Sequence, residues 1–168
     1  MIHLGSSNSN STLSKWVAET QIQPNAIDLK IDKVFAIDSS KVFMISEETK
    51  EHRGSSELKP DLNGYWHLKP GCYEVIMEGN ITVGEDEAGW VITRSTLNRN
   101  GLFITSGLYD SGYSGVMAGA LHVEVNDAII KQGTRVAQFI LFKAESLNQY
   151  DGDYGTGKAD EIMYKEEK

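Results

Sequence analysis

Hydrophobic and polar residues alternate in several short segments of this chain, and a period of two is typical of half-buried β-strands. The clearest example runs from Ile27 to Ile31, where three aliphatic residues alternate with Asp28 and Lys30. The alternation predicts a strand whose aliphatic side chains enter the core, and it predicts that Asp28 points away from the core.

The same kind of pattern recurs along most of the chain. Further strands are predicted at residues 34–37, 41–45, 65–69, 72–77, 80–83, 90–93, 115–125, 128–131 and 135–142. Turn residues separate them, with Asn126 and Asp127 predicting a hairpin between the strands on either side. Because strands do not alternate with helices, the pattern predicts an all-β sandwich or barrel.

A few segments depart from the strand pattern. Residues 13–19 predict one short helix, 46–63 a surface loop, and the acidic run 85–87 a solvated loop. No repeat or linker divides residues 1–168, so one domain is predicted. The segment 148–168 is rich in Gly and Asp and predicts a mobile C-terminal tail.

Composition narrows the classes of function. A formal net charge of −8 argues against general binding to nucleic acid or an anionic membrane, because both need a basic surface. A small anionic ligand remains compatible, since a few arginines suffice for a local positive site. With one cysteine, Cys72, no internal disulfide can form, and no signal-like or membrane-spanning apolar run is present, so an intracellular, cytoplasmic protein is expected.

The stretch from Arg94 to Arg99 carries candidate phosphate-binding chemistry. Arg94, Ser95 and Thr96 place a guanidinium and two hydroxyls together, and Arg99 adds a second cation. Phosphate oxygens accept hydrogen bonds from all of these groups. Taken alone, the motif is a weak signal, and the competing interpretation is an arginine in a surface ion pair with hydroxyls that close a turn.

A glycine-rich segment follows at residues 106–115. Gly107 would let the backbone approach a flat ligand closely, Tyr113 offers a ring for a sugar, and Asp110 offers a base for a water molecule. The alternative is a hairpin whose Asp110 caps its own turn.

The segment 133–138 is a turn entering a strand, where Arg135 and Ala137 share one side and Gln138 lies on the other. An ordinary edge strand is the competing interpretation. His52, His67 and His122 show no spacing typical of a metal site.

Taken in order, these segments resemble the motifs of the superfamily of trimeric dUTP diphosphatases and dCTP deaminases. Residues 22–29 resemble the first motif, 94–102 the second, 106–115 the third, 133–138 the fourth and 150–158 a degraded fifth. The resemblance implies a distorted jelly-roll barrel with at most one or two short helices. It also implies a homotrimer with shared active sites, which the tail closes as a lid, and a pyrimidine deoxynucleoside triphosphate as substrate.

The resemblance further implies roles for individual residues. Ser95 and Gln138 would contact phosphates with support from Arg94, Thr96 and Arg99, and backbone near Gly107 would read the pyrimidine. Tyr113 would pack on deoxyribose, Tyr154 on the base, and Lys158 would add a positive charge. Mg²⁺ would arrive on the triphosphate, with Asp28 as an outer-shell partner.

Two activities of the superfamily remain to be separated. Deamination of cytosine needs a carboxylate beside the base to move protons, whereas hydrolysis of dUTP needs an activated water molecule. Without gaps, the glutamate of the deaminases aligns with Ala120, which cannot transfer a proton. Glu124 takes its place only if residues are inserted after Gly115.

We therefore predict a dUTP diphosphatase in which Asp110 orients the water. The sequence is compatible with a cellular or a viral gene for this enzyme. A dCTP deaminase using Glu124 is the alternative. Ala120 and the altered fifth motif also leave open a non-catalytic nucleotide-binding or structural member of the fold.

Overall fold

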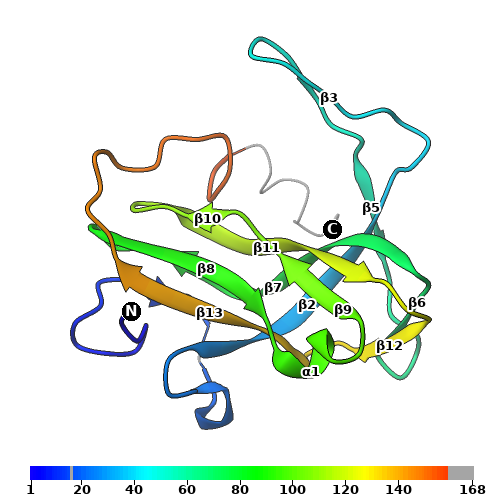
Figure 1. Ribbon diagram of the computed structural model, residues 1–168, viewed down its shortest axis with the longest axis horizontal. Coiled ribbons are helices and arrows are strands. Elements are labelled where there is room, and N and C mark those ends of the chain that lie inside the picture. Colours follow the sequence, from blue (N-terminus) through cyan, green and yellow to red (C-terminus); the bar gives the residue numbers. More distant parts are fainter. Residues whose placement is uncertain (16, 159–168) are drawn as a thin grey trace.

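A computed structural model describes residues 1–15 and 17–158. The fold is built on a strongly curled antiparallel sheet with the strand order β10-β8-β13-β2-β7-β11-β9 (Figure 1). The strands of this sheet are listed here: β2 (Ile27–Ile37), β7 (Gly71–Thr82), β8 (Glu87–Thr93), β9 (Leu102–Thr105), β10 (Leu108–Tyr109), β11 (Ser114–Val123) and β13 (Arg135–Lys143).

Shorter strands complete the fold. They are β1 (Thr12–Leu13) on β7, β5 (Ser55–Leu58) on β2, the pair β6 (Tyr65–Leu68) and β12 (Ala128–Lys131), and the hairpin β3 (Met44–Ile45) and β4 (Lys50–Glu51). Helical structure is confined, among the described residues, to α1 (Ser95–Asn98) and a 3-10 turn at Glu19–Gln21. The prediction of an all-β fold with one or two short helices is confirmed.

The sequence pattern predicted the type of secondary structure correctly, but the bounds of the strands less accurately. The two strands predicted at 27–31 and 34–37 are one long strand, β2, with an irregularity in its pairing between Ile31 and Lys33. The predicted helix at 13–19 is wrong, because Thr12–Leu13 is a strand and, among the described residues, the helical turn in this region begins at Glu19. The predicted hairpin across residues 126–127 is also wrong, because β12 pairs with β6 rather than β11.

The core lies inside the curled sheet. It includes Ile31, Met77, Met117, Leu121 and Phe139, each at most 1% exposed. Buried and more exposed residues largely alternate along β11 and β13, whereas residues 75–77 of β7 are buried in succession. Burial of such apolar side chains contributes roughly 1.5–3 kcal/mol each, so they fix which face of each strand points inward.

The N-terminal segment is fastened to this body by a buried carboxylate. Glu87 at the start of β8 accepts hydrogen bonds from the Ser11 hydroxyl (2.5 Å) and the Asn10 backbone N–H (2.9 Å), and Lys143 Nζ lies 2.9 Å away. Burial alone would raise the pKa of Glu87, but these hydrogen bonds lower it to about 2. The predicted solvated loop is therefore wrong at Glu87, which is fully buried.

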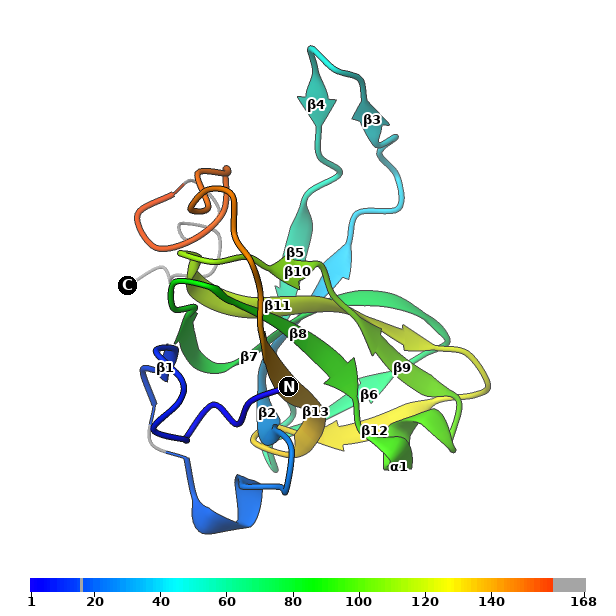
Figure 2. The ribbon, with the colours of Figure 1, turned by 60° about the vertical axis from the view of Figure 1, so that its left-hand side comes forward.

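A hairpin arm, residues 38–54, projects from the body at the end of β2 (Figure 2). Its first turn is closed by Asp38, whose carboxylate accepts from the Ser40 backbone N–H (3.0 Å) and hydroxyl (2.6 Å). The surface position predicted for residues 46–63 holds for residues 46–54, which are exposed, but the segment also contains the strands β4 and β5.

Candidate functional site

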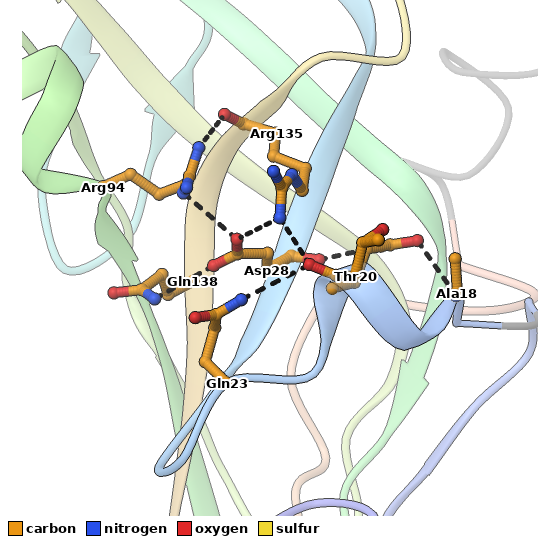
Figure 3. A network of polar contacts seen from close by, with 8 residues as sticks. Ala18, Thr20, Gln23, Asp28, Arg94, Arg135 and Gln138 are labelled. Atoms are coloured by element: carbon orange, nitrogen blue, oxygen red, sulfur yellow. Dashed lines mark hydrogen bonds and ion pairs between the residues drawn. The ribbon is translucent and has the colours of Figure 1, made fainter.

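A fully buried carboxylate organises the first group of candidate residues. Asp28 on β2 is 0% exposed, and its Oδ2 lies 3.2 Å from both Arg94 Nε and Arg135 Nη1. Gln138 Nε2 donates to Oδ1 at 3.0 Å, and Figure 3 shows these side chains converging on Asp28. The carboxylate compensates the mutual repulsion of two cations and fixes their positions.

Asp28 lies on the face opposite the apolar core, as the alternation predicted, but that face is buried for a structural reason. β2 is a central strand between β13 and β7, and Arg135 and Gln138 come from the neighbouring β13. Backbone carbonyls hold the two cations as well: Arg94 donates to the Arg135 carbonyl (3.0 Å), and Arg135 donates to the carbonyl of Thr20. The face opposite the apolar core is thus covered by polar groups that the local pattern does not reveal.

The other predicted phosphate-binding residues lie next to this group. Ser95 and Thr96 begin α1 directly after Arg94, and Arg99 follows its end; all three are exposed. The side chains of Arg94 and Arg135 keep 27% and 35% of their surface exposed. We call Asp28, Arg94, Ser95, Arg135 and Gln138 the arginine cluster.

A second group surrounds the glycine-rich turn between β10 and β11, which we call the hairpin although β10 pairs with β8 and β11 pairs with β7 and β9. Tyr113 is buried and donates to the Val116 carbonyl (2.8 Å), and its ring packs edge-on against Tyr109 at 5.3 Å. Burial raises the pKa of Tyr109. Asp110 is exposed at the turn, where its carbonyl accepts from the Tyr113 backbone N–H (3.0 Å).

This hairpin borders a cleft of about 860 Å³. The floor is formed by strand residues, and the walls come from the hairpin, the arm and the tail. The residues that the argument uses are Glu74, Thr105 and Ala120 on the floor, Gly107 and Tyr113 on the hairpin, Lys50, His52 and Arg53 on the arm, and Tyr150, Asp153 and Tyr154 on the tail. The volume is ample for a nucleotide.

The tail lies along the hairpin up to residue 158. Tyr150 and Thr156 donate backbone N–H bonds to the carbonyls of Ser111 and Ser114, each at 2.7 Å, and the Tyr150 ring packs on Tyr113 at 5.4 Å. These contacts hold residues 150–158 of the tail, which the sequence predicts to be mobile unless something orders it; residues 159–168 lie outside the described residues.

The arm reaches the tail across the cleft. Lys50 Nζ lies 2.9 Å from Asp153 Oδ2 and 5.4 Å from the centre of the Tyr154 ring. The hydrogen bond and the opposite charge raise the pKa of Lys50 and lower that of Asp153. Lys158, predicted to add a positive charge, lies 3.8 Å from Asp151 instead of lining the cleft.

The two groups of candidate residues are separate in one chain. None of the arginine cluster lines the cleft, and α1 lies far from the β10–β11 hairpin in both ribbon views (Figures 1 and 2). Glu124 also lies outside the cleft lining: its side chain is 57% exposed beyond β11, and its Oε1 lies 3.9 Å from His122 Nδ1. Ala120 is on the cleft floor.

Sequence reasoning missed several cleft residues. Lys50, His52 and Arg53 lie in a segment interpreted as a loop, and Glu74 is a single polar residue in a strand. No sequence pattern marks these four residues as site residues. They reach the cleft only through the path of the arm and the pairing of β7 with β11. For Arg135 the sequence did offer an indication, because the alternation of β13 places it on the same side of the strand as Ala137.

No residues of the described part of the chain form a ready metal site: no three His, Cys, Asp or Glu gather there. Asp28 does not fit a role as magnesium ligand, because it is buried and its oxygens already accept from two guanidinium groups and an amide. Among the same residues, no helix is long and apolar enough to cross a membrane.

The curled sheet is similar to those of solved structures. A 2'-deoxycytidine 5'-triphosphate deaminase from Agrobacterium tumefaciens matches with a TM-score of 0.59 and 16% identity, over 78% of this chain and 43% of that chain. A dUTPase from phage phi11 of S. aureus matches with a TM-score of 0.52 and 11% identity, over 88% of this chain and 99% of the other. The fold thus defines the class of dUTPase-like jelly-roll proteins.

Sequence comparison then identifies the family. The model of the dCTP deaminase-like family matches residues 7–144, and the chain belongs to this family. A relative from Halobacterium salinarum, named a probable deoxyuridine 5'-triphosphate nucleotidohydrolase, is 32% identical over 86% of this chain and 88% of its own length.

Proposed function

We propose that this protein hydrolyses dUTP to dUMP and pyrophosphate. The observation that carries the proposal is the cleft beside the β10–β11 hairpin, which has room for a nucleotide and has Ala120, not Glu124, on its floor. Glu124, the carboxylate that a deaminase would use under the gapped alignment, does not line this cleft. The name of the Halobacterium salinarum relative supports the same activity.

The arginine cluster supports a role in binding the triphosphate. Arg94 and Arg135 are fixed by Asp28 yet keep exposed surface, so anionic oxygens can reach guanidinium groups that are already ordered. Ser95, Thr96 and Arg99 add donors beside them, and Gln138 completes the group. We assign phosphate contacts to these residues, with Asp28 as the residue that positions the arginines.

The cleft supports a role in binding the nucleoside. Backbone at Gly107 contacts the pyrimidine, Tyr113 packs on deoxyribose, and Tyr154 stacks on the base from the tail. Asp110, exposed at the hairpin turn, orients the attacking water toward the triphosphate. Mg²⁺ enters as part of the magnesium–dUTP substrate, held by phosphate oxygens and water, and neutralises the charge that develops on hydrolysis.

Since the cleft and the arginine cluster are separate in one chain, we propose a homotrimer in which one subunit supplies the arginine cluster and a neighbour supplies the hairpin. The tail, residues 148–168, acts as a lid that excludes water from the closed site. In this arrangement residues 1–168 form one domain whose site is completed by assembly.

The function is tested with purified protein, Mg²⁺ and either dUTP or dCTP. We expect dUMP and pyrophosphate from dUTP, and loss of turnover in Asp110→Asn with nucleotide binding retained. Asp127→Asn, on a surface pair with Lys69, serves as the matched control. Ammonia from dCTP without pyrophosphate from dUTP would establish a deaminase, and binding of both nucleotides without turnover would establish a non-catalytic protein.

A further inference from the structure

Three residues on adjacent strands form a row on the cleft floor. Ala120 of β11 is paired with Glu74 of β7 on one side and with Thr105 of β9 on the other. Directly paired residues of antiparallel strands point to the same face, with Cβ atoms about 4.5–5.5 Å apart. All three line the cleft, so Glu74 brings a carboxylate to within one strand spacing of Ala120.

The carboxylate of Glu74 is oriented by its surroundings. The Ser55 hydroxyl, from β5 beyond β2, donates to Glu74 Oε2 at 2.9 Å. The acidic group on the tail wall, Asp153, is paired with Lys50. Because the alanine side chain at 120 is small, the space over it is bordered by the Glu74 carboxylate and accessible to a planar ring.

Under the proposed function, the cleft beside the hairpin holds the nucleoside. Gly107, Tyr113 and Ala118 line the same cleft as the row, so a base bound beside the hairpin would present its outer edge to the row. Carboxylate oxygens accept hydrogen bonds and do not donate them. Cytosine presents an amino donor on that edge, where uracil presents a carbonyl acceptor.

We propose that Glu74 is a specificity-determining residue that reads the edge of the pyrimidine base and makes the cleft accept cytosine-bearing nucleotides at least as well as uracil-bearing ones. This inference rests on the proposed function, because it assumes that the cleft holds the base of a deoxynucleoside triphosphate. It adds a determinant of base choice, on β7, to the residues of the hairpin.

The test compares the affinities of non-hydrolysable α,β-imido analogues of dCTP and dUTP for the wild type and for Glu74→Gln. The amide keeps the size of the side chain but can donate to the uracil carbonyl. We expect the ratio of the two dissociation constants to shift toward dUTP by about tenfold or more, which matches the discrimination expected of a base-edge contact. Glu57→Gln, paired with Lys59 away from the cleft, should leave the ratio unchanged.

Each outcome separates this inference from the proposed function. A wild type that hydrolyses dUTP, with a ratio unchanged within about twofold in Glu74→Gln, overturns the role of Glu74 alone. A wild type that binds the dUTP analogue more than about tenfold more tightly than the dCTP analogue also overturns the role of Glu74 alone. Binding of neither analogue by the folded wild type overturns both. A urea unfolding curve confirms that Glu74→Gln is folded, and Glu74→Ala, which removes the acceptor without adding a donor, should weaken dCTP analogue binding while sparing the dUTP analogue.

Discussion

At the scale of single residues, two buried carboxylates hold segments that are distant in sequence. Asp28 joins β2, β13 and the residue before α1, and Glu87 joins the N-terminal segment to β8 and β13. A buried carboxylate is stabilising only when its partners offset the loss of hydration. Removing either the carboxylate or its partner leaves the remaining buried group without compensation.

Replacing Asp28 by Asn should therefore affect both stability and binding. The amide keeps the shape but leaves Arg94 and Arg135 without a counter-charge, and their partial exposure limits the loss to about 2–3 kcal/mol. Urea unfolding measures this change, and dUTP affinity should fall at the same time. Asp127→Asn should change stability by less than about 0.5 kcal/mol, since its pair with Lys69 is at the surface. Equal effects of the two substitutions would contradict the role of Asp28.

The carboxyl of Glu87 makes stability depend on acid pH. Its pKa is about 2 in the folded chain, against an ordinary value of 4.5, so its contribution is fully present above pH 4.5 and is lost as pH falls through about 2. In Glu87→Gln this part of the pH dependence should disappear, and stability at neutral pH should fall by roughly 2 kcal/mol. Thermal unfolding of both proteins between pH 2 and pH 7 measures it. An unchanged acid profile in the variant would contradict this assignment.

At the scale of elements, the docking of the tail depends on a close approach of two backbones. Gly155 has φ +120°, and a Cβ there would lie 2.6 Å from the Ser114 carbonyl oxygen. Only glycine fits this contact, which is next to the hydrogen bond from Thr156 to Ser114.

Gly155→Ala should release the tail from the hairpin while the sheet stays intact. We expect faster amide exchange at Tyr150 and Thr156, with little change in the melting temperature. Gly157→Ala is the matched control, because its φ of +81° is also positive but a Cβ there meets nothing within 4 Å. If both variants exchange alike, backbone strain rather than the clash at Ser114 governs the docking.

At the scale of the whole molecule, a shared active site predicts complementation between inactive subunits. Asp28→Asn damages the arginine cluster and Asp110→Asn damages the hairpin, so neither homotrimer has an intact site. Trimers refolded from an equal mixture should regain about a quarter of wild-type activity, because a site is intact when each of its two contributing subunits carries the undamaged half. Activity of the refolded mixture, with mixed trimers verified by mass spectrometry, measures this. Mixed trimers without activity would show that the site does not span two subunits.

The sequence by itself determined the type of secondary structure and the motif segments of the candidate site. Alternation in β2, β11 and β13 reports directly which side chains enter the core, because the period of a strand is fixed by its backbone geometry. The turn between β10 and β11 was found from its glycines, because several glycines close together signal a turn. The hairpin pairing predicted there does not form, since β10 pairs with β8 and β11 pairs with β7 and β9.

Only the tertiary structure decided which strands pair and which polar residues meet. The sequence pattern turned Asp28 away from the core without revealing that it is buried, and it placed Glu87 in a solvated loop, since local alternation does not report the partners that a neighbouring strand brings. The same limit applies to Glu74, which reaches the cleft through the pairing of β7 with β11, and to Lys50, which reaches it through the path of the arm. Pairing between distant strands depends on the packing of the whole sheet, so contacts of this kind are set by the fold and not by the residues next to them in the chain.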